Sequence, residues 1–247
     1  MTPTSHIVSS YESELRDLDS KISHMGGMTE QLLANGFDAL AKRDPARAER
    51  VIASDQMVDT YNREIEERAI AAIAKRQPMA IDLRQIMAAM RVSNDLERIG
   101  DLAKNLAKRA LAVASEQHPR SLMAGLGHMV ELAMRQLKDV LDAFTQRDAE
   151  KALAVWRSDA QIDAMYNSVF RELLTYMMED PRNIGLCTQL LFVAKNIERI
   201  GDHTTNIAET VHYLVKGTAL ADDRPKGDVT SSTPFESDPI KGSWSSQ

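Results

Sequence analysis

The sequence contains the same blocks twice, and this duplication is the strongest constraint on its fold. The pentapeptide ERIGD stands at residues 97–101 and again at 198–202. Two further pairs precede it in the same order: SDQMVDTYN at 54–62 with SDAQIDAMYN at 158–167, and KRDPARA at 42–48 with QRDAEKA at 146–152. Three blocks in the same order favour an internal duplication over a chance match between two alanine-rich segments. Each half of the chain should therefore fold in the same way.

The breaks between long periodic stretches define the expected helices. Proline is favoured at the start of a helix. Four dipeptides that end in proline mark candidate breaks: Asp44-Pro45, Gln77-Pro78, His118-Pro119 and Asp180-Pro181. The stretches between them predict an all-α fold with helices over 5–42, 45–76, 79–115, 119–147, 149–179 and 182–216. Long helices separated by short breaks are typical of up-and-down bundles. We therefore expect two tandem three-helix bundles.

The same breaks divide the chain into three parts. A first three-helix repeat is expected over residues 1–117 and a second over residues 118–216. Residues 217–247 are rich in proline, glycine, serine and aspartate. Such a composition does not bury enough apolar surface to order a segment, so this part is predicted to be a disordered tail.

Composition argues against several classes of function. The 247-residue chain has a formal net charge of −6 and a sequence pI of about 5.6, which argues against binding nucleic acid or an anionic lipid surface. No window has the apolar run of a signal peptide or a membrane span. The single cysteine, Cys187, cannot form an internal disulfide and fits a reducing, cytoplasmic setting. Any membrane association is expected to come through a partner.

Each repeat places carboxylates four residues apart on its expected helices. The four pairs are Asp55 with Asp59, Glu97 with Asp101, Asp159 with Asp163, and Glu198 with Asp202. At about 100° per residue, Glu97 and Asp101 lie on the same side of their helix as the apolar Ile86 and Met90. The other pairs line up with apolar residues in the same manner. These carboxylates therefore continue a core-facing stripe and do not form a separate polar face.

Carboxylates that face inward require a positive partner, because an unpaired buried charge is costly. The sequence leaves two candidates for this partner, which are an arginine network between helices and a metal ion. Arg98 and Arg199 neighbour the glutamates in sequence, but they point about 100° away from them. The many oxygen donors suit a hard cation such as Mg, Mn, Ca or iron more than structural zinc. Gly100 and Gly201 would then let a neighbouring helix approach the site closely.

No catalytic residue emerges from the sequence. Glu209-x-x-His212 resembles half of a di-iron bundle motif, but that chemistry needs two such pairs and the first half has none. His203 is either a ligand beside Asp202 or a polar residue at the rim. No glycine-rich phosphate loop and no nucleophile with a base partner is recognisable. A metalloenzyme or metal-storage bundle stays open as an alternative, as does a structural bundle whose carboxylates pair with arginines.

At ERIGD and its duplicate, the chain resembles the PhoU family of phosphate-signalling regulators. The resemblance covers roughly residues 5–215 and includes YESELRDLDSKISHMGGM, QPMAIDLRQIMAAMRVSNDLERIGD and AKNIERIGDHTTNIAE. PhoU-like proteins consist of two tandem three-helix bundles, and their E(D)-x-x-x-D motifs carry multinuclear metal clusters. The resemblance thus implies a divalent metal or a multinuclear cluster (Fe, Mn, Mg or Zn) held by Asp55, Asp59, Glu97, Asp101, Asp159, Asp163, Glu198 and Asp202.

The resemblance also implies a function. Members of this family are cytoplasmic, often dimeric and without established catalytic activity. They negatively regulate the phosphate-starvation regulon and link a high-affinity phosphate ABC transporter to a sensor histidine kinase. We therefore expect a non-enzymatic negative regulator of phosphate uptake that forms a homodimer and acts as an adaptor. Its expected partners are the transporter ATPase and the kinase, with no nucleic acid and no membrane contact except through these partners.

Overall fold

The computed structural model describes residues 3–117 and 119–220. In this part of the chain every regular element is helical and no strand is present. The elements are α1 (Pro3–Lys42), α2 (Pro45–Arg76), α3 (Ile81–Ala112), α4 (Arg120–Gln146), α5 (Ala149–Arg157), α6 (Asp159–Glu179), the short 3-10 helix η1 (Pro181–Asn183) and α7 (Ile184–Lys216). The predicted all-α class is confirmed. The expected disordered tail lies, from residue 221 onward, outside the described residues.

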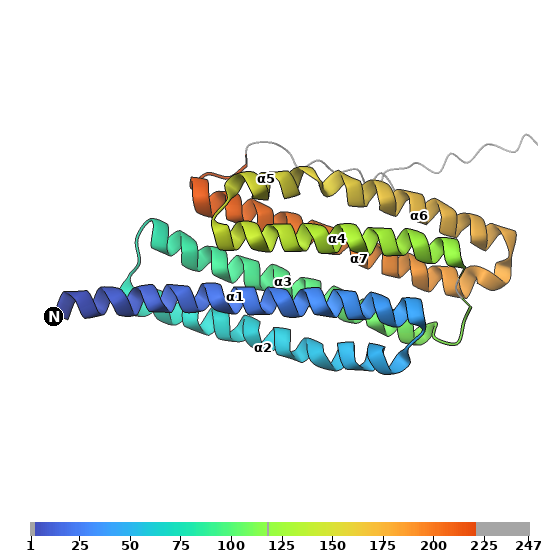
Figure 1. The fold of residues 1–247 in the computed structure, drawn as a ribbon, viewed down its shortest axis with the longest axis horizontal. Coiled ribbons are helices and arrows are strands. Elements are labelled where there is room, and N and C mark those ends of the chain that lie inside the picture. Colours follow the sequence, from blue (N-terminus) through green and yellow to red (C-terminus); the bar gives the residue numbers. More distant parts are fainter. Residues whose placement is uncertain (1–2, 118, 221–247) are drawn as a thin grey trace, which may run out of the picture.

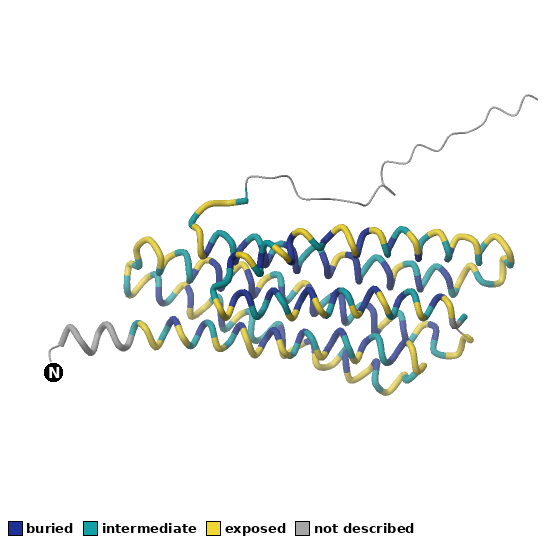
Figure 2. The backbone as a smooth tube through the Cα atoms, turned by 45° about the horizontal axis from the view of Figure 1, so that its top comes forward, coloured by how far each residue is buried: buried dark blue, intermediate teal, exposed yellow. Residues whose placement is uncertain are grey.

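The helices form two three-helix bundles that lie side by side along a common long axis (Figure 1). The first contains α1, α2 and α3, and the second contains α4, α7 and the broken helix α5–α6. α3 packs against α7 between the bundles and α1 contacts α4, whereas among the described elements α2 contacts only α1 and α3. Buried apolar residues from both bundles form one continuous cluster. Figure 2 shows buried positions in dark blue along the helices of both bundles. The predicted tandem three-helix bundles are confirmed.

The repeated Arg-Asp pair builds the same turn in each bundle. Arg43 after α1 and Arg147 after α4 adopt the left-handed conformation, with φ of 52° and 56°. The aspartate that follows is extended and caps the next helix with its carboxylate. Asp44 Oδ1 accepts from the Arg47 backbone N–H at 2.9 Å, and Asp148 caps the start of α5. The duplicated block therefore explains why the second helix of each bundle begins where it does.

The predicted helix over 149–179 is interrupted at Ser158, where α5 ends and α6 begins. The Ser158 hydroxyl donates to the Val155 carbonyl at 2.7 Å. From α4, the Gln136 side-chain amide donates to the Ser158 carbonyl at 3.0 Å and to its hydroxyl at 2.9 Å. Side-chain hydrogen bonds that compete with the helical ladder interrupt a helix in this way. The interruption places Asp159 in the first turn of α6.

Specific contacts join the two bundles. Arg147 Nη2 donates to Asp19 Oδ2 of α1 at 2.7 Å. Gly26 of α1 lies so close to α4 that a Cβ at this position would be 2.7 Å from Leu141 Cδ1. The bundles thus pack tightly against each other. None of the helices that the structure describes combines the length and the apolarity needed to cross a membrane.

Candidate functional site

The first carboxylate cluster consists of Asp55 and Asp59 of α2 with Glu97 and Asp101 of α3. The packing of α2 on α3 brings the four groups together. Burial raises the pKa of the Asp55 carboxyl, and the nearby charges of Asp59 and Asp101 raise it further. Asp55 is only 2% exposed, whereas the other three side chains are partly exposed. The cluster therefore reaches from the interior of the bundle to its surface.

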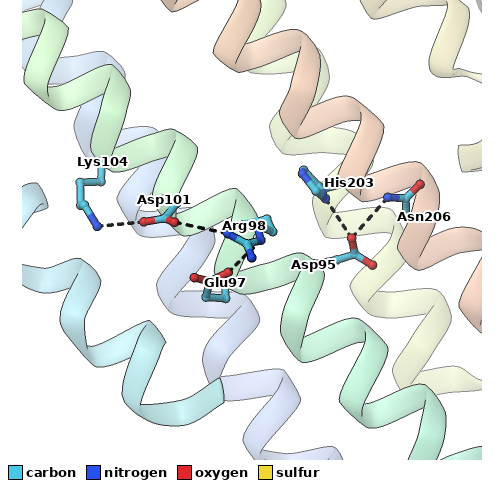
Figure 3. Close-up of polar contacts among 7 residues, drawn as sticks. All are labelled: Asp95, Glu97, Arg98, Asp101, Lys104, His203 and Asn206. Atoms are coloured by element: carbon cyan, nitrogen blue, oxygen red, sulfur yellow. Dashed lines mark hydrogen bonds and ion pairs between the residues drawn. The ribbon is translucent and has the colours of Figure 1, made fainter. Parts of the chain in front are cut away.

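Lys104 cross-links this cluster, and sequence reasoning did not single it out. Its ammonium donates to Asp55 Oδ2 at 2.5 Å and to Asp101 Oδ1 at 2.8 Å, the second contact being drawn in Figure 3. Hydrogen bonds to Asp101 and Asp55 hold the pKa of Lys104 well above its usual value, so the side chain stays charged. The positive partner of the carboxylates is thus a lysine that follows Asp101 by one helical turn, which is a spacing that the sequence displays.

Some oxygens of the first cluster remain without a hydrogen bond. Among the described residues, Asp55 Oδ1 and Glu97 Oε2 are buried and have no hydrogen-bond partner. Arg98 Nε lies 3.4 Å from Glu97 Oε2, but the Arg98 side chain is 54% exposed and this ion pair is loose. Burial raises the pKa of the Glu97 carboxyl, and Arg98 opposes the rise. Two buried oxygens therefore remain available to a cation.

The glycine of each ERIGD copy lies at a close contact between helices. A Cβ on Gly100 would be 3.1 Å from Asp55 Oδ1 and 3.3 Å from Val58 Cγ1, both on α2. A Cβ on Gly201 would be 2.9 Å from Ile162 Cδ1 on α6. The expectation that these glycines let a neighbouring helix approach agrees with both contacts.

The second carboxylate cluster consists of Asp159 and Asp163 of α6 with Glu198 and Asp202 of α7. It is the more deeply buried of the two, since Asp159, Asp163 and Glu198 are 3%, 5% and 5% exposed. Lys195 donates to Glu198 Oε1 at 2.8 Å, while Glu198 Oε2 is buried with no hydrogen-bond partner among the described residues. Burial raises the pKa of the Glu198 carboxyl and Lys195 opposes the rise. Lys195 precedes Glu198 by three residues, about one helical turn, so this pairing could have been predicted from the sequence spacing.

Thr205 occupies the position in the second repeat that Lys104 occupies in the first. Each residue follows the aspartate of its ERIGD copy by three positions. Thr205 Oγ1 donates to Asp159 Oδ1 at 2.9 Å, and Asp159 is the counterpart of Asp55 in the duplicated block. The same site on the buried aspartate is therefore served by an ammonium in one bundle and by a neutral hydroxyl in the other.

The donor chemistry of both clusters fits a hard divalent cation, because carboxylate oxygens are the ligands that such ions prefer. Buried oxygens without a hydrogen bond, such as Asp55 Oδ1 and Glu198 Oε2, point to the same conclusion. As the side chains lie, however, no group of three or more His, Cys, Asp or Glu residues in the described part of the chain is placed to hold a metal ion. Metal entry would require side chains to turn, and in the first cluster Lys104 would have to leave.

Two other residues considered from the sequence have structural partners. His203 Nδ1 lies 2.9 Å from Asp95 Oδ1, to which Asn206 also donates at 3.4 Å (Figure 3). Asp95 belongs to α3, so this contact joins the two bundles. Glu209 Oε1 accepts from Trp156 Nε1 at 3.0 Å and thereby ties α7 to α5. Both contacts connect helices, and neither places an additional ligand in the clusters.

A duplicated pair of three-helix bundles, each with a carboxylate cluster between its second and third helices, defines the class of this protein as a helical-bundle protein with paired acidic sites. The PhoU domain family model matches residues 22–110 and 126–211, one segment in each bundle. The chain therefore belongs to the PhoU family, as its resemblance predicted.

Relatives and solved structures agree with this assignment. The phosphate-specific transport system accessory protein PhoU homolog of Rhizobium meliloti is 56% identical over 226 residues, which cover 92% of this chain and 95% of that protein. The corresponding PhoU protein of Escherichia coli is 40% identical over 212 residues, or 86% of this chain and 88% of that protein. The crystal structure of PhoU from Pseudomonas aeruginosa has a TM-score of 0.81 at 38% identity and covers 84% of this chain and 100% of its own. That of the phosphate transport system regulatory protein PhoU from Streptococcus pneumoniae has a TM-score of 0.79 at 30% identity, covering 85% of this chain and 99% of its own.

Proposed function

We propose that this chain is a non-enzymatic regulator of phosphate uptake that acts with a phosphate-specific transport system. The observation that carries the proposal is the 56% identity, over 92% of the chain, to a protein named as an accessory protein of phosphate-specific transport. The structurally similar protein of Streptococcus pneumoniae is named a phosphate transport system regulatory protein. Both names describe accessory or regulatory proteins, which agrees with the expectation that this chain is not an enzyme.

In this proposal the chain represses the phosphate-starvation regulon when phosphate is plentiful. It acts in the cytoplasm as a homodimeric adaptor that contacts the transporter ATPase and a sensor histidine kinase, and it reaches the membrane only through them. Exposed apolar side chains at the two helix turns suit such contacts. Met79 and Ile81 at the α2–α3 turn are 81% and 63% exposed, and Met178 and Ile184 at the α6–α7 turn are 85% and 49% exposed.

The regulatory role is tested by deleting the gene and measuring a phosphate-starvation reporter in high phosphate. We expect the reporter to be expressed after deletion and to be repressed again when the full chain is restored. Met79→Asp and Met178→Asp should fold but fail to restore repression, because a charge would disrupt an apolar contact. Met57→Asp, at a residue 55% exposed in the middle of α2, is the matched control and should restore it. A reporter that stays silent after deletion contradicts the repressor role.

We further propose that the two carboxylate clusters bind divalent ions. The proposed ligands are Asp55, Asp59, Glu97 and Asp101 in the first cluster and Asp159, Asp163, Glu198 and Asp202 in the second. Their acidic composition supports this, as does the burial of Asp55, Asp159, Asp163 and Glu198. Asp55 Oδ1, Glu97 Oε2 and Glu198 Oε2 are buried oxygens without a hydrogen bond among the described residues. A bound ion would supply positive charge between the second and third helices of a bundle, and these residues would hold the helices in one relative position for a partner to recognise.

Elemental analysis of the purified chain tests metal binding after reconstitution with Fe, Mn, Mg or Zn. The wild type is expected to retain metal, and Asp101→Ala/Asp202→Ala is expected to lose most of it. Glu131→Ala/Asp139→Ala removes two exposed carboxylates of α4 outside the clusters and should retain as much metal as the wild type. A metal-free wild type, or equal retention by the two double variants, contradicts the proposal.

A further inference from the structure

The duplication provides an internal comparison that separates the two clusters. At equivalent positions the first repeat carries Lys104 and the second carries Thr205. Lys104 donates to the buried Asp55, and Thr205 donates to its counterpart Asp159. The surrounding E-x-x-x-D and D-x-x-x-D motifs are the same in both repeats. The second repeat also carries Lys195, which donates to Glu198, where the first repeat has Asn94. The effect of position 104 or 205 on cation binding is therefore measured within each cluster and not between them.

We propose that Lys104 is the resident cation of the first carboxylate cluster and that a divalent ion enters it only by displacing the ammonium from Asp55 and Asp101. This inference rests on the metal-binding part of the proposed function. The ammonium contacts Asp55 of α2 at 2.5 Å and Asp101 of α3 at 2.8 Å, so it already makes the bridge between helices that an ion would make. Two positive charges cannot share these oxygens at such distances without strong repulsion.

A second observation identifies the cluster as more than a surface group of acids. Asp55 is 2% exposed, and its Oδ1 has no hydrogen-bond partner among the described residues although it is buried. This oxygen faces α3 at Gly100, between Glu97 and Asp101. Lys104 satisfies only the other oxygen, Oδ2. A divalent ion carries a larger charge than an ammonium and accepts more ligands, so it could bind both carboxylate oxygens of Asp55.

The position of Lys104 also allows it to leave. Its side chain is 23% exposed and Asp101 is 36% exposed, so the ammonium lies where the cluster opens to solvent. A lysine has a flexible four-carbon stem, and its head can move into water without a change of backbone. In the metal-free protein the lysine therefore keeps α2 and α3 together, and it lowers the affinity of the first cluster for an ion by the contacts that must be broken.

The experiment measures Mn²⁺ binding to the full chain in which the second cluster is disabled by Glu198→Gln/Asp202→Asn. Adding Lys104→Thr, which installs the residue of the second repeat, should tighten Mn²⁺ binding by about 10- to 100-fold, the equivalent of one lost charge-assisted hydrogen bond. Lys104→Gln serves as a second uncharged variant should the threonine variant fold poorly. Free Mn²⁺ is followed by its electron paramagnetic resonance signal and the affinity is confirmed by calorimetry.

Controls separate the charge of Lys104 from its other properties. Lys104→Arg keeps a positive charge and should bind Mn²⁺ no more tightly than its parent. Lys108→Thr makes the same exchange at an exposed lysine one turn further along α3 and should change nothing. Without Mn²⁺, Lys104→Thr should unfold at a lower temperature than its parent, and Mn²⁺ should raise its unfolding temperature by the larger amount.

The reciprocal exchange tests the same idea in the second bundle. With the first cluster disabled by Asp55→Asn/Asp101→Asn, Thr205→Lys should weaken Mn²⁺ binding about tenfold or more, because it adds a competing ammonium. If the second cluster binds Mn²⁺ but neither uncharged variant of Lys104 tightens the first beyond about threefold, the resident-cation inference is wrong and metal binding by the family motifs stands. If no cluster binds Mn²⁺ in any variant, both proposals are wrong.

Discussion

Gly100 shows how a single residue sets the distance between α2 and α3. A Cβ there would be 3.1 Å from Asp55 Oδ1 and 3.3 Å from Val58 Cγ1. Neither neighbour can give way easily, because Lys104 holds the carboxylate and valine is stiff at χ1. Gly100→Ala should therefore destabilise the protein by about 1–3 kcal/mol in urea unfolding, although alanine is the better helix former.

Gly27 provides the matched control in α1. It is exposed, and a Cβ there would meet nothing within 4 Å. Gly27→Ala should raise the free energy of unfolding by up to about 1 kcal/mol, because only the helix propensity changes. If Gly100→Ala proved as stable as Gly27→Ala, close helix packing would not be the reason for the glycine in ERIGD.

At the level of single residues, the sequence supported the inward orientation of the carboxylates but did not identify their partners. The duplicated spacing placed Asp55 and Glu198 on apolar stripes, and both lie inside the bundles. Helical spacing predicts that Arg98 points away from the carboxylates, but its flexible side chain bends back to lie 3.4 Å from Glu97 and 4.0 Å from Asp101. The shorter contacts come from Lys104 and Lys195, one helical turn away. That Lys104 also reaches Asp55 on another helix depends on how α2 packs, which the sequence does not display.

The turn between α1 and α2 contains a residue in an unfavourable conformation. Arg43 has φ of 52°, a conformation that costs a residue with a side chain roughly 1–2 kcal/mol and costs glycine almost nothing. Its side chain is exposed, and within the described part of the chain its guanidinium makes only a 3.4 Å contact with the Glu116 carbonyl. We expect Arg43→Gly to stabilise the protein by about 0.5–1 kcal/mol in thermal or urea unfolding.

The equivalent turn of the second bundle is the control for this prediction. Arg147 has φ of 56°, but its guanidinium also donates to Asp19 Oδ2 at 2.7 Å and lies over the Phe144 ring, 4.7 Å from the ring centre. Arg147→Gly removes these contacts together with the strain, so its gain should be smaller than that of Arg43→Gly or reversed. A loss of stability in Arg43→Gly would contradict the strain argument.

An ion pair between α1 and α2 predicts a dependence of stability on pH. Arg76 Nη2 donates to Glu14 Oε1 at 2.8 Å, and this bond lowers the pKa of the Glu14 carboxyl below its usual value. Because the folded-state pKa is the lower one, the stabilisation is complete above the usual glutamate pKa and is lost as pH falls through the lowered value. Glu14→Gln should cost about 0.5 kcal/mol at neutral pH and almost nothing in strong acid, because the pair is partly exposed. Glu12→Gln removes an exposed carboxylate of the same helix and is the control, which should not reproduce the loss of stability of Glu14→Gln at neutral pH.

At the level of helices, most boundaries followed from local signals in the sequence. The predicted helix over 45–76 matches α2 (Pro45–Arg76), because Asp44 caps it and proline begins it. The helix expected over 149–179 is broken at Ser158 because Gln136 reaches it from α4. That contact is distant in sequence, and neither glycine nor proline marks the break. Local signals therefore predict where such a helix starts, whereas an interruption that depends on tertiary packing cannot be predicted from the local sequence.

At the scale of the whole molecule, the described helices share one apolar core, and this determines how the protein should unfold. The buried residues of both bundles belong to one continuous cluster, and the α3–α7 contact lies between the bundles. A duplicated protein whose halves shared little surface would unfold in two steps. Here the loss of one bundle exposes the apolar face of the other, so we expect a single cooperative transition.

Trp156 makes this expectation testable because it reports on the second bundle alone. It lies on α5 and is 5% exposed, and in a Trp244→Phe background it is the only tryptophan of the chain. Ile65 is fully buried in α2, which among the described elements touches only the first bundle. Ile65→Val should cost about 1 kcal/mol and shift the urea midpoint equally by Trp156 fluorescence and by far-UV circular dichroism. Val169→Ala in α6 should likewise shift both signals together, whereas a Trp156 transition unmoved by Ile65→Val would show that the bundles unfold independently.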